Sequence, residues 1–224
     1  MILSMIVTVD GPAGAGKSTV ARLLARRLGV AYLDSGATYR AAALKAMREL
    51  DDLNSPHALA DVVRCAAIEL IDSDDALVVL LDGLDVSSEI RNPEVTGNVH
   101  YLASSEPVRA VLVDLQRKIG AALGSFVTEG RDQGTVAFPQ ADCKIFLLAD
   151  ASIRARRRCK ELLAAGRDAN YDDVLQAIVK RDHQDTTRKS GPLTRPDGAV
   201  EIDTSNMTID EVVTAMYNAA AAAE

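Results

Sequence analysis

The chain has 224 residues, of which 48% are hydrophobic and 25% are charged, and its formal net charge is −7. This length suits one globular domain with a sizeable core and a small inserted subdomain, and the acidic balance argues against a surface that binds nucleic acid. The three cysteines form no C-x-x-C pair and the three histidines have no ligand spacing, so we expect no structural zinc site and a reducing cytoplasm.

The amino-terminal stretch "MILSMIVTVD" lacks a basic segment and runs directly into a glycine-rich loop. We therefore interpret it as a strand and not as a signal peptide. The apolar run "ALVVLL" at 76–81 is far too short to cross a bilayer. No association with a membrane is expected.

Strand-like runs alternate with longer helical patterns along most of the chain. The predicted strands are 6–10, 31–34, 126–129, 144–148 and 199–203. The predicted helices are 17–28, 36–49, 108–123, 153–165, 172–187 and 209–222. Such alternation predicts an α/β fold, with helices on both faces of a five-stranded parallel sheet.

The middle of the chain has a different pattern. Residues 67–90 read as short strands joined by turns rich in Asp, Ser and Gly. This pattern predicts a small antiparallel unit, which we interpret as an inserted subdomain.

The loop after the first strand, "GPAGAGKS" at 11–18, fits the pattern G-x-x-x-x-G-K-[ST]. Its backbone N–H groups and the start of the following helix would cradle phosphate, Lys17 would reach the β- and γ-phosphates, and Ser18 would bind Mg²⁺. A plain glycine-rich turn is the alternative, but the flanking strand and helix favour a nucleoside triphosphate site and a three-layer sandwich of the P-loop NTPase type. The predicted ATP-binding residues are Gly11, Pro12, Ala13, Gly14, Ala15, Gly16, Lys17, Ser18 and Thr19.

P-loops also serve GTP switches, motors and transporters. The chain contains no Asn-Lys-x-Asp guanine signature, and its length leaves little room for the extra modules of a motor. A kinase acting on a small molecule is therefore favoured.

Two segments that follow the second and third strands should face the same sheet edge as the loop, where ligands gather in open α/β sheets. In "LDSGATYR" at 33–40, Ser35 is either a helix N-cap or a substrate contact, and Arg40 should point back toward the sheet edge. An arginine at this position would contact an anion, which this segment alone does not identify.

In "EGRDQGT" at 129–135, Arg131 and Asp132 lie between Gly130 and Gly134. The glycines would let the backbone approach a ligand, so we favour substrate contact. The alternative is a structural ion pair of Arg131 with Asp132 or Glu129.

Residues 154–189 contain ten Lys or Arg and six Asp or Glu, against the acidic balance of the whole chain. This local excess suggests a small anionic ligand, although a solvated helix face is the alternative.

Four motifs in this order resemble the bacterial-type cytidylate kinases, which are P-loop nucleoside monophosphate kinases: the phosphate loop, "LDSGATYR", "EGRDQGTVAFP" and "RDHQDTTRKSGPL" at 181–193. The stretches "DGLDVSSEIR" at 82–91 and "PVRAVLVDLQR" at 107–117 extend the resemblance to nearly the whole chain. Adenylate and thymidylate kinases share only the first loop. The resemblance implies transfer of a phosphoryl group from ATP with Mg²⁺ to CMP or dCMP, in pyrimidine nucleotide metabolism. We expect a cytoplasmic enzyme that acts as a monomer.

By position, the resemblance implies nine residues that bind CMP: Ser35, Arg40, His100, Arg109, Arg131, Asp132, Arg181, Asp185 and Arg188. Arg40 and Arg131 would hold the acceptor phosphate, and Arg109 and Asp132 would face cytosine. Arg181 and Asp185 would approach the sugar. The implied catalytic residues are Lys17, Arg131, Arg157, Arg158 and Arg188, with Arg157 or Arg158 carried to the transferring phosphate by a mobile lid.

Position 100 departs from the family pattern, because His100 stands where family members carry a serine that helps to read the base. An imidazole can still donate or accept a hydrogen bond, but it is larger than a hydroxyl group.

We expect a single domain over 1–224, with a core at 1–34, 107–152 and 190–224. The acceptor region and its insert would span 35–106, the lid 153–169, and one long helix 170–189.

Three other classes of protein would differ from this sequence. A different small-molecule phosphotransferase should lack the pair Arg181 and Asp185, and a catalytically silent ATP-binding regulator should have lost Lys17 or the lid arginines. A nucleic-acid ATPase would need a basic track.

Overall fold

The computed structural model describes residues 5–72 and 77–223. Residues 1–4 of the predicted amino-terminal strand segment, and 73–76 within the predicted insert, lie outside the described residues. The chain divides into two compact units, the first made of Met1–Val30 with Val127–Glu224 and the second of Ala31–Phe126.

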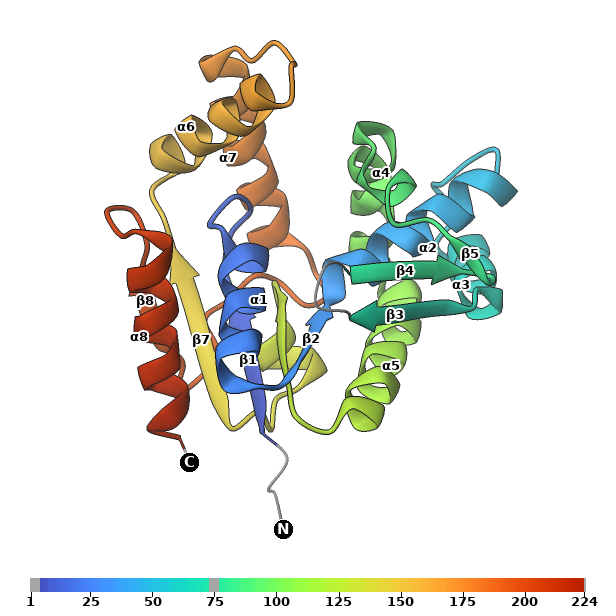
Figure 1. The fold of residues 1–224 in the computed structure, drawn as a ribbon. Coiled ribbons are helices and arrows are strands. Elements are labelled where there is room, and N and C mark those ends of the chain that lie inside the picture. Colours follow the sequence, from blue (N-terminus) through green and yellow to red (C-terminus); the bar gives the residue numbers. More distant parts are fainter. Residues whose placement is uncertain (1–4, 73–76, 224) are drawn as a thin grey trace. The chain divides into compact units, whose positions relative to one another are not determined.

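A five-stranded parallel sheet with helices around it confirms the predicted α/β fold (Figure 1). Its strands, in the order β2-β6-β1-β7-β8, are β1 (Ile6–Asp10), β2 (Ala31–Asp34), β6 (Phe126–Gly130), β7 (Cys143–Leu148) and β8 (Val200–Asp203). Val9 lies beside Ile145, and Leu147 lies beside Ile202, in parallel register. Strands covered by helices are apolar on both faces, and the side chains of Val7, Val9 and Leu147 are fully buried.

In the first unit, the helices are α1 (Lys17–Leu28), α6 (Ala151–Ala164), α7 (Tyr171–Thr187) and α8 (Ile209–Ala221). Helices α1 and α8 pack against each other beside the sheet, and α6 and α7 form a second packed pair (Figure 1). Thr208 and Glu211 start α8 with a capping box, which satisfies backbone N–H groups that the first helical turn leaves without partners.

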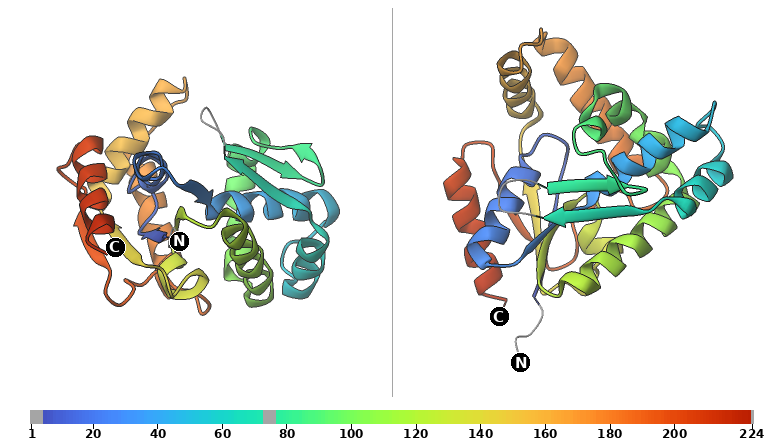
Figure 2. Two further views of the ribbon diagram at one scale, coloured as in Figure 1. Left: turned by 60° about the horizontal axis from the view of Figure 1, so that its bottom comes forward. Right: turned by 45° about the vertical axis from the view of Figure 1, so that its right-hand side comes forward.

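In the second unit, a three-stranded antiparallel sheet confirms the predicted insert (Figure 2). The unit consists of α2 (Ser35–Glu49), α3 (Pro56–Cys65), β3 (Ile68–Asp72), β4 (Leu77–Leu81), β5 (Leu84–Asp85), a 3₁₀ turn (Glu89–Arg91), α4 (Pro93–Ser104) and α5 (Glu106–Leu123). Its core is mostly aliphatic and contains buried alanines of α2 together with Leu59, Leu102 and Leu112.

Three observed elements are absent from the predicted ones: α3, α4 and the π-helix at Gln133–Ala137. The signals for α3 were present, because Ser55 caps the helix and Pro56 occupies its first turn. Helix α4 is harder to predict, since Gly97 lies in its middle and lowers helix propensity. The backbone N–H groups of Gln133 and Gly134 in the π-helix donate to Asp10 of β1, which lies more than 120 residues earlier in the sequence.

Of the predicted core segment 107–152, residues 107–126 belong to the compact unit Ala31–Phe126. The functional division into core, acceptor region and lid stays a prediction. In the part of the chain that the structure describes, no helix is long and apolar enough to span a membrane.

Candidate active site

The phosphate loop joins β1 to α1, as the sequence predicts. Gly11 lies against β7, and a Cβ atom at this position would come within 2.3 Å of the backbone oxygen of Leu147. Gly14 has a φ of +77°, in the left-handed region that glycine adopts most easily. The loop therefore requires glycine at both positions, for close packing at the first and for backbone conformation at the second.

Lys17 begins α1 and is only 5% exposed. Its Nζ donates a hydrogen bond to the carbonyl oxygen of Pro12 at 2.8 Å. Burial, followed by the positive charges of Arg131 and Arg181 and opposed by Glu129, lowers the pKa of Lys17 to about 7. A bound anion would stabilise the charged form of this amine, so the surroundings of Lys17 favour the binding of phosphate.

Ser18 and Glu129 supply oxygen atoms at the same end of the sheet. The Ser18 hydroxyl group donates to Glu129 Oε1 at 2.7 Å. Mg²⁺ prefers oxygen ligands and takes one or two from a protein while phosphates and water supply the rest. No cluster of three or more His, Cys, Asp or Glu side chains that could hold a metal occurs among the described residues. The Ser18 hydroxyl group and the Glu129 carboxylate are oxygen donors of the kind that a nucleotide-bound Mg²⁺ takes from a protein.

Asp10 shapes the loop that carries Arg131. Its two carboxylate oxygens accept hydrogen bonds from the backbone N–H groups of Gln133 at 2.8 Å and Gly134 at 2.7 Å. Burial raises the pKa of Asp10 to about 6 despite these bonds. A Cβ atom on Gly134 would lie 2.8 Å from Thr8 Oγ1, so this glycine allows close packing within the protein. The approach of a ligand to this loop stays a prediction.

Arg131 pairs with Asp185 of α7, its Nε donating to Oδ2 at 2.7 Å. Its Nη1 donates to the Gly130 carbonyl oxygen at 3.1 Å. The recorded ion-pair partner of Arg131 is therefore Asp185, 54 residues away in the sequence, whereas the predicted alternative named Asp132 or Glu129. Two of the five N–H groups of Arg131 have acceptors among the described residues, which leaves three for an anion.

The charges around Asp185 extend this cationic site. Burial opposes ionisation, but Arg131, Arg181 and Arg188 hold the pKa of Asp185 below its usual value. Arg188 Nη2 lies 3.8 Å from Asp132 Oδ1. The first unit thus brings together the predicted residues Lys17, Arg131, Asp132, Arg181, Asp185 and Arg188.

The arginines of α6 differ from each other in their contacts. Arg157 donates to the Thr204 carbonyl oxygen at 2.6 Å, and Arg158 is half-exposed and pairs with Glu161. Arg154, which is not among the predicted site residues, donates to the Ala13 carbonyl oxygen of the phosphate loop at 2.9 Å. The part predicted for Arg157 or Arg158 at the transferring phosphate remains a prediction.

In the second unit, the cap of α2 corrects one prediction. Asp34 is the N-cap, since its Oδ1 accepts from the backbone N–H of Ala37 at 2.8 Å, and Ser35 is the first helical residue. Asp34 Oδ2 also accepts from Arg40 Nη2 at 2.9 Å. A Cβ atom on Gly36 would lie 2.8 Å from Arg40 Nη1, so this glycine makes room for the guanidinium group.

Arg40 Nε is buried and has no hydrogen-bond partner among the described residues. A buried donor left unpaired costs about 1–3 kcal/mol, which a ligand acceptor would recover. The unpaired Nε donor of Arg40 is therefore suited to an anionic ligand.

The remaining predicted residues of this unit are Arg109 and His100. Arg109 is buried on α5, and its Nη1 donates to the Tyr39 hydroxyl group at 3.1 Å. His100 is exposed on α4, where its ring centroid lies 4.1 Å from that of Tyr101. Because the Gly97 carbonyl oxygen lies 2.7 Å from Nδ1 and can only accept, Nδ1 carries the proton and Nε2 is an acceptor in the neutral ring.

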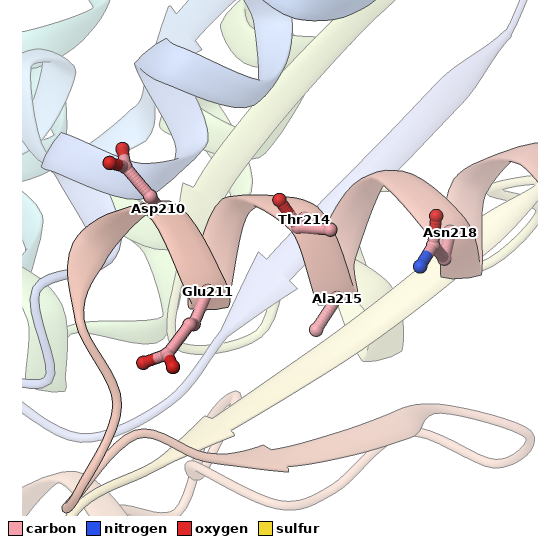
Figure 3. A pocket seen from close by; sticks show the side chains of 5 residues that line it. All are labelled: Asp210, Glu211, Thr214, Ala215 and Asn218. Atoms are coloured by element: carbon pink, nitrogen blue, oxygen red, sulfur yellow. The ribbon is translucent and has the colours of Figure 1, made fainter.

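A surface hollow of about 400 Å³ along α8 is a poor alternative for the nucleotide site (Figure 3). It is lined by Asp210, Glu211, Thr214, Ala215 and Asn218. The carboxylates at its rim would repel phosphate, and no basic side chain lines it.

A phosphate loop on a parallel sheet, with buried cations beside it, defines a P-loop nucleotide-binding protein. Residues 7–222 match the profile of the cytidylate kinase family. The chain is 46% identical over 217 residues to the cytidylate kinase of Caldanaerobacter subterraneus subsp. tengcongensis, covering 97% of this chain and 95% of the relative. It is 48% identical over 207 residues to that of Desulforamulus reducens, covering 92% of each chain. The chain therefore belongs to the cytidylate kinase family.

Among solved structures, the crystal structure of an uncharacterized protein from Eubacterium ventriosum is similar, with a TM-score of 0.53. The match covers 98% of this chain and 99% of the other at 12% identity, and it supports the fold alone.

Proposed function

We propose that the protein transfers the γ-phosphoryl group of ATP to CMP or dCMP, giving ADP with CDP or dCDP. The observation that carries the proposal is the surroundings of Lys17, a buried amine in a phosphate loop whose pKa is lowered by burial and by Arg131 and Arg181. Membership of the cytidylate kinase family directs the acceptor assignment. Together they support a phosphotransferase for two anionic nucleotides.

The acceptor phosphate is already an anion, so its attack needs no general base. The work of the protein is to bring two negative nucleotides together and to neutralise charge as the phosphoryl group moves. Lys17 and the loop N–H groups would hold the donor phosphates. Ser18 would hold Mg²⁺, which neutralises phosphate charge when bound.

The residues proposed for the acceptor have donors available. Arg131 retains three N–H groups, and Arg40 has a buried Nε without a partner among the described residues. Planar guanidinium groups suit bidentate contact with phosphate. We assign the acceptor phosphate to these two residues, and cytosine to Arg109 and Asp132.

For the sugar side we assign Arg181 and Asp185, with Arg188 close to the nucleotide, Ser35 in contact with the acceptor, and Arg157 or Arg158 at the transferring phosphate. Closure of a lid at 153–169 would exclude water, which otherwise competes as acceptor. We further propose that the protein acts in the cytoplasm as a monomer and binds neither nucleic acid nor membrane.

The proposal is tested by a coupled assay of ADP formation with CMP, dCMP, UMP and AMP as acceptors. We expect CMP and dCMP to have the highest kcat/KM and AMP to be poor. Equal efficiency with AMP and CMP would contradict the acceptor assignment.

His100 is expected to tune recognition of the base. Its Nε2 acceptor suits the exocyclic amino group of cytosine, which donates hydrogen bonds. His100→Ser should change KM for CMP by about 2- to 10-fold, while kcat stays within about twofold, because base contacts are similar in the ground and transition states. The control is His57→Ser, at an exposed histidine of α3. An equal fall of kcat and kcat/KM would place His100 in the chemical step instead.

ATP binding is expected to take up a proton above neutral pH. In the free protein the lowered pKa of Lys17, about 7, leaves the amine largely neutral above that pH, and bound phosphates favour its charged form. ATP affinity should therefore fall as pH rises above about 7. Calorimetry at about pH 8 in buffers of different ionisation enthalpy should reveal uptake approaching one proton.

The matched variant for this measurement is Lys17→Arg, whose guanidinium group is always charged. It should remove the proton uptake. Uptake that persists in this variant would assign the proton to another group.

A further inference from the structure

Arg154 makes four side-chain hydrogen bonds next to the phosphate loop. It lies in the first turn of α6 and is 5% exposed. Its Nε donates to the Ala149 carbonyl oxygen at 2.8 Å, and its Nη1 donates to that of Ala13 at 2.9 Å. A two-point contact with Asp182 of α7 completes the set, with Nη1 to Oδ1 at 3.1 Å and Nη2 to Oδ2 at 2.6 Å.

This bonding distinguishes Arg154 from the arginines assigned to phosphate. Four of its five N–H groups have acceptors within the described residues, and Asp182 neutralises its charge. Arg131, by comparison, keeps three N–H groups for a ligand. Arg154 therefore has one N–H group left for an anion. Its influence on ATP binding would be indirect, through the residues to which it is hydrogen-bonded.

One of those groups is the peptide that joins Ala13 to Gly14. The peptide unit is planar and trans, so its C=O and N–H point in opposite directions. A bond that fixes the Ala13 carbonyl oxygen toward Arg154 therefore turns the Gly14 N–H away from Arg154. A Cβ atom on Gly14 would lie 3.4 Å from the Arg154 Cβ, so the stem of Arg154 also packs against the loop.

We propose that Arg154 is a positioning residue that fastens the Ala13 peptide of the phosphate loop to Asp182 on α7, and so presets the loop N–H groups for ATP. The inference rests on the proposed function, in which this loop binds ATP. It also gives α7, which carries Arg181 and Asp185, a direct hydrogen-bonded connection to the donor loop. A preset loop binds phosphate without first ordering itself, so loss of the connection should weaken ATP binding above all.

The test compares Arg154→Lys, which keeps the charge but loses the planar fork, with Arg154→Gln, which loses both. Dissociation constants for ATP, KM for ATP and CMP, and melting temperatures are measured on the same preparations. We expect Arg154→Lys to raise the ATP constants by about 10-fold, the size of one charge-assisted hydrogen bond, and to change KM for CMP by less than about twofold. Arg154→Gln should have the larger effect. Arg156→Gln, at an exposed position of the same helix, should leave all values unchanged.

A second variant covers the case in which a buried substitution prevents folding. Asp182→Asn keeps the shape of its side chain and removes the charge that holds Arg154. It should raise the ATP constants by about fivefold, and the double variant with Arg154→Lys should show less than the sum of the two effects. Additive effects would overturn the connection between the two residues.

A fall in melting temperature with unchanged ATP constants would make Arg154 merely structural and overturn the proposal. Failure of the wild-type protein to phosphorylate CMP would remove the proposed function. The ATP dissociation constants would then still decide the role of Arg154, because they do not depend on an acceptor.

Discussion

Replacing Lys17 with alanine should reduce kcat by about 10²- to 10³-fold, the loss that follows removal of one preorganised donor to a developing negative charge. Its amine is buried in the phosphate loop, where Nζ bonds to the Pro12 carbonyl oxygen and the charge of Arg131 helps to lower its pKa. No other described lysine lies in this loop. Steady-state kinetics with saturating ATP and CMP measures the change.

The fold should survive this substitution. Lys17 has a lower pKa in the folded protein than in a free chain, so the folded state binds its proton less tightly and the charged amine does not stabilise the fold. The melting temperature of Lys17→Ala should therefore equal or exceed that of the wild type at neutral pH. Lys118→Ala, at an exposed lysine paired with Asp114, is the control and should retain full activity. An unfolded Lys17→Ala protein would indicate that the loop lysine is structural.

Arg131→Lys should lower both kcat and the affinity for CMP, with a loss in kcat/KM of about 2–4 kcal/mol. An ammonium group offers charge without the fork that holds a phosphate in two parallel bonds, and the contact should strengthen as the acceptor oxygen attacks. The ion pair with Asp185 adds a structural role, which a lysine can keep in part. Stability should consequently change little.

Melting temperatures and CMP kinetics on the same preparation separate these roles. Arg195→Lys, at an exposed arginine paired with Glu201, is the matched control for loss of a guanidinium group outside the site. A destabilised Arg131→Lys enzyme with normal kinetics would remove Arg131 from the acceptor site.

Local patterns in the sequence were sufficient to predict the frame of the site. The strand at 6–10 is a short apolar run that ends at Asp10, and the glycines and Lys17 follow it directly, so the loop and its helix could be placed from adjacent residues. The same holds for the β-strand at 31–34 and for the three-stranded insert.

The partners of the charged side chains could not be predicted in this way. Arg131 meets Asp185 across 54 residues, and Arg154 meets the Ala13 carbonyl oxygen across 141. In "RARRR" at 154–158 the residue types are nearly uniform, and only the packing of α6 decides that Arg154 is buried while Arg158 is half-exposed. Glu129 could have been predicted as a site residue, because this carboxylate lies near the carboxyl end of a buried strand, where ligands gather in open α/β sheets.

The most direct test of the account is ³¹P nuclear magnetic resonance of a mixture of the protein, ATP, Mg²⁺ and CMP. We expect ADP and CDP to appear together in equal amounts as ATP and CMP disappear, because the phosphoryl group passes directly between the two nucleotides. Consumption of ATP with release of inorganic phosphate and no CDP would contradict the proposed phosphoryl transfer to CMP.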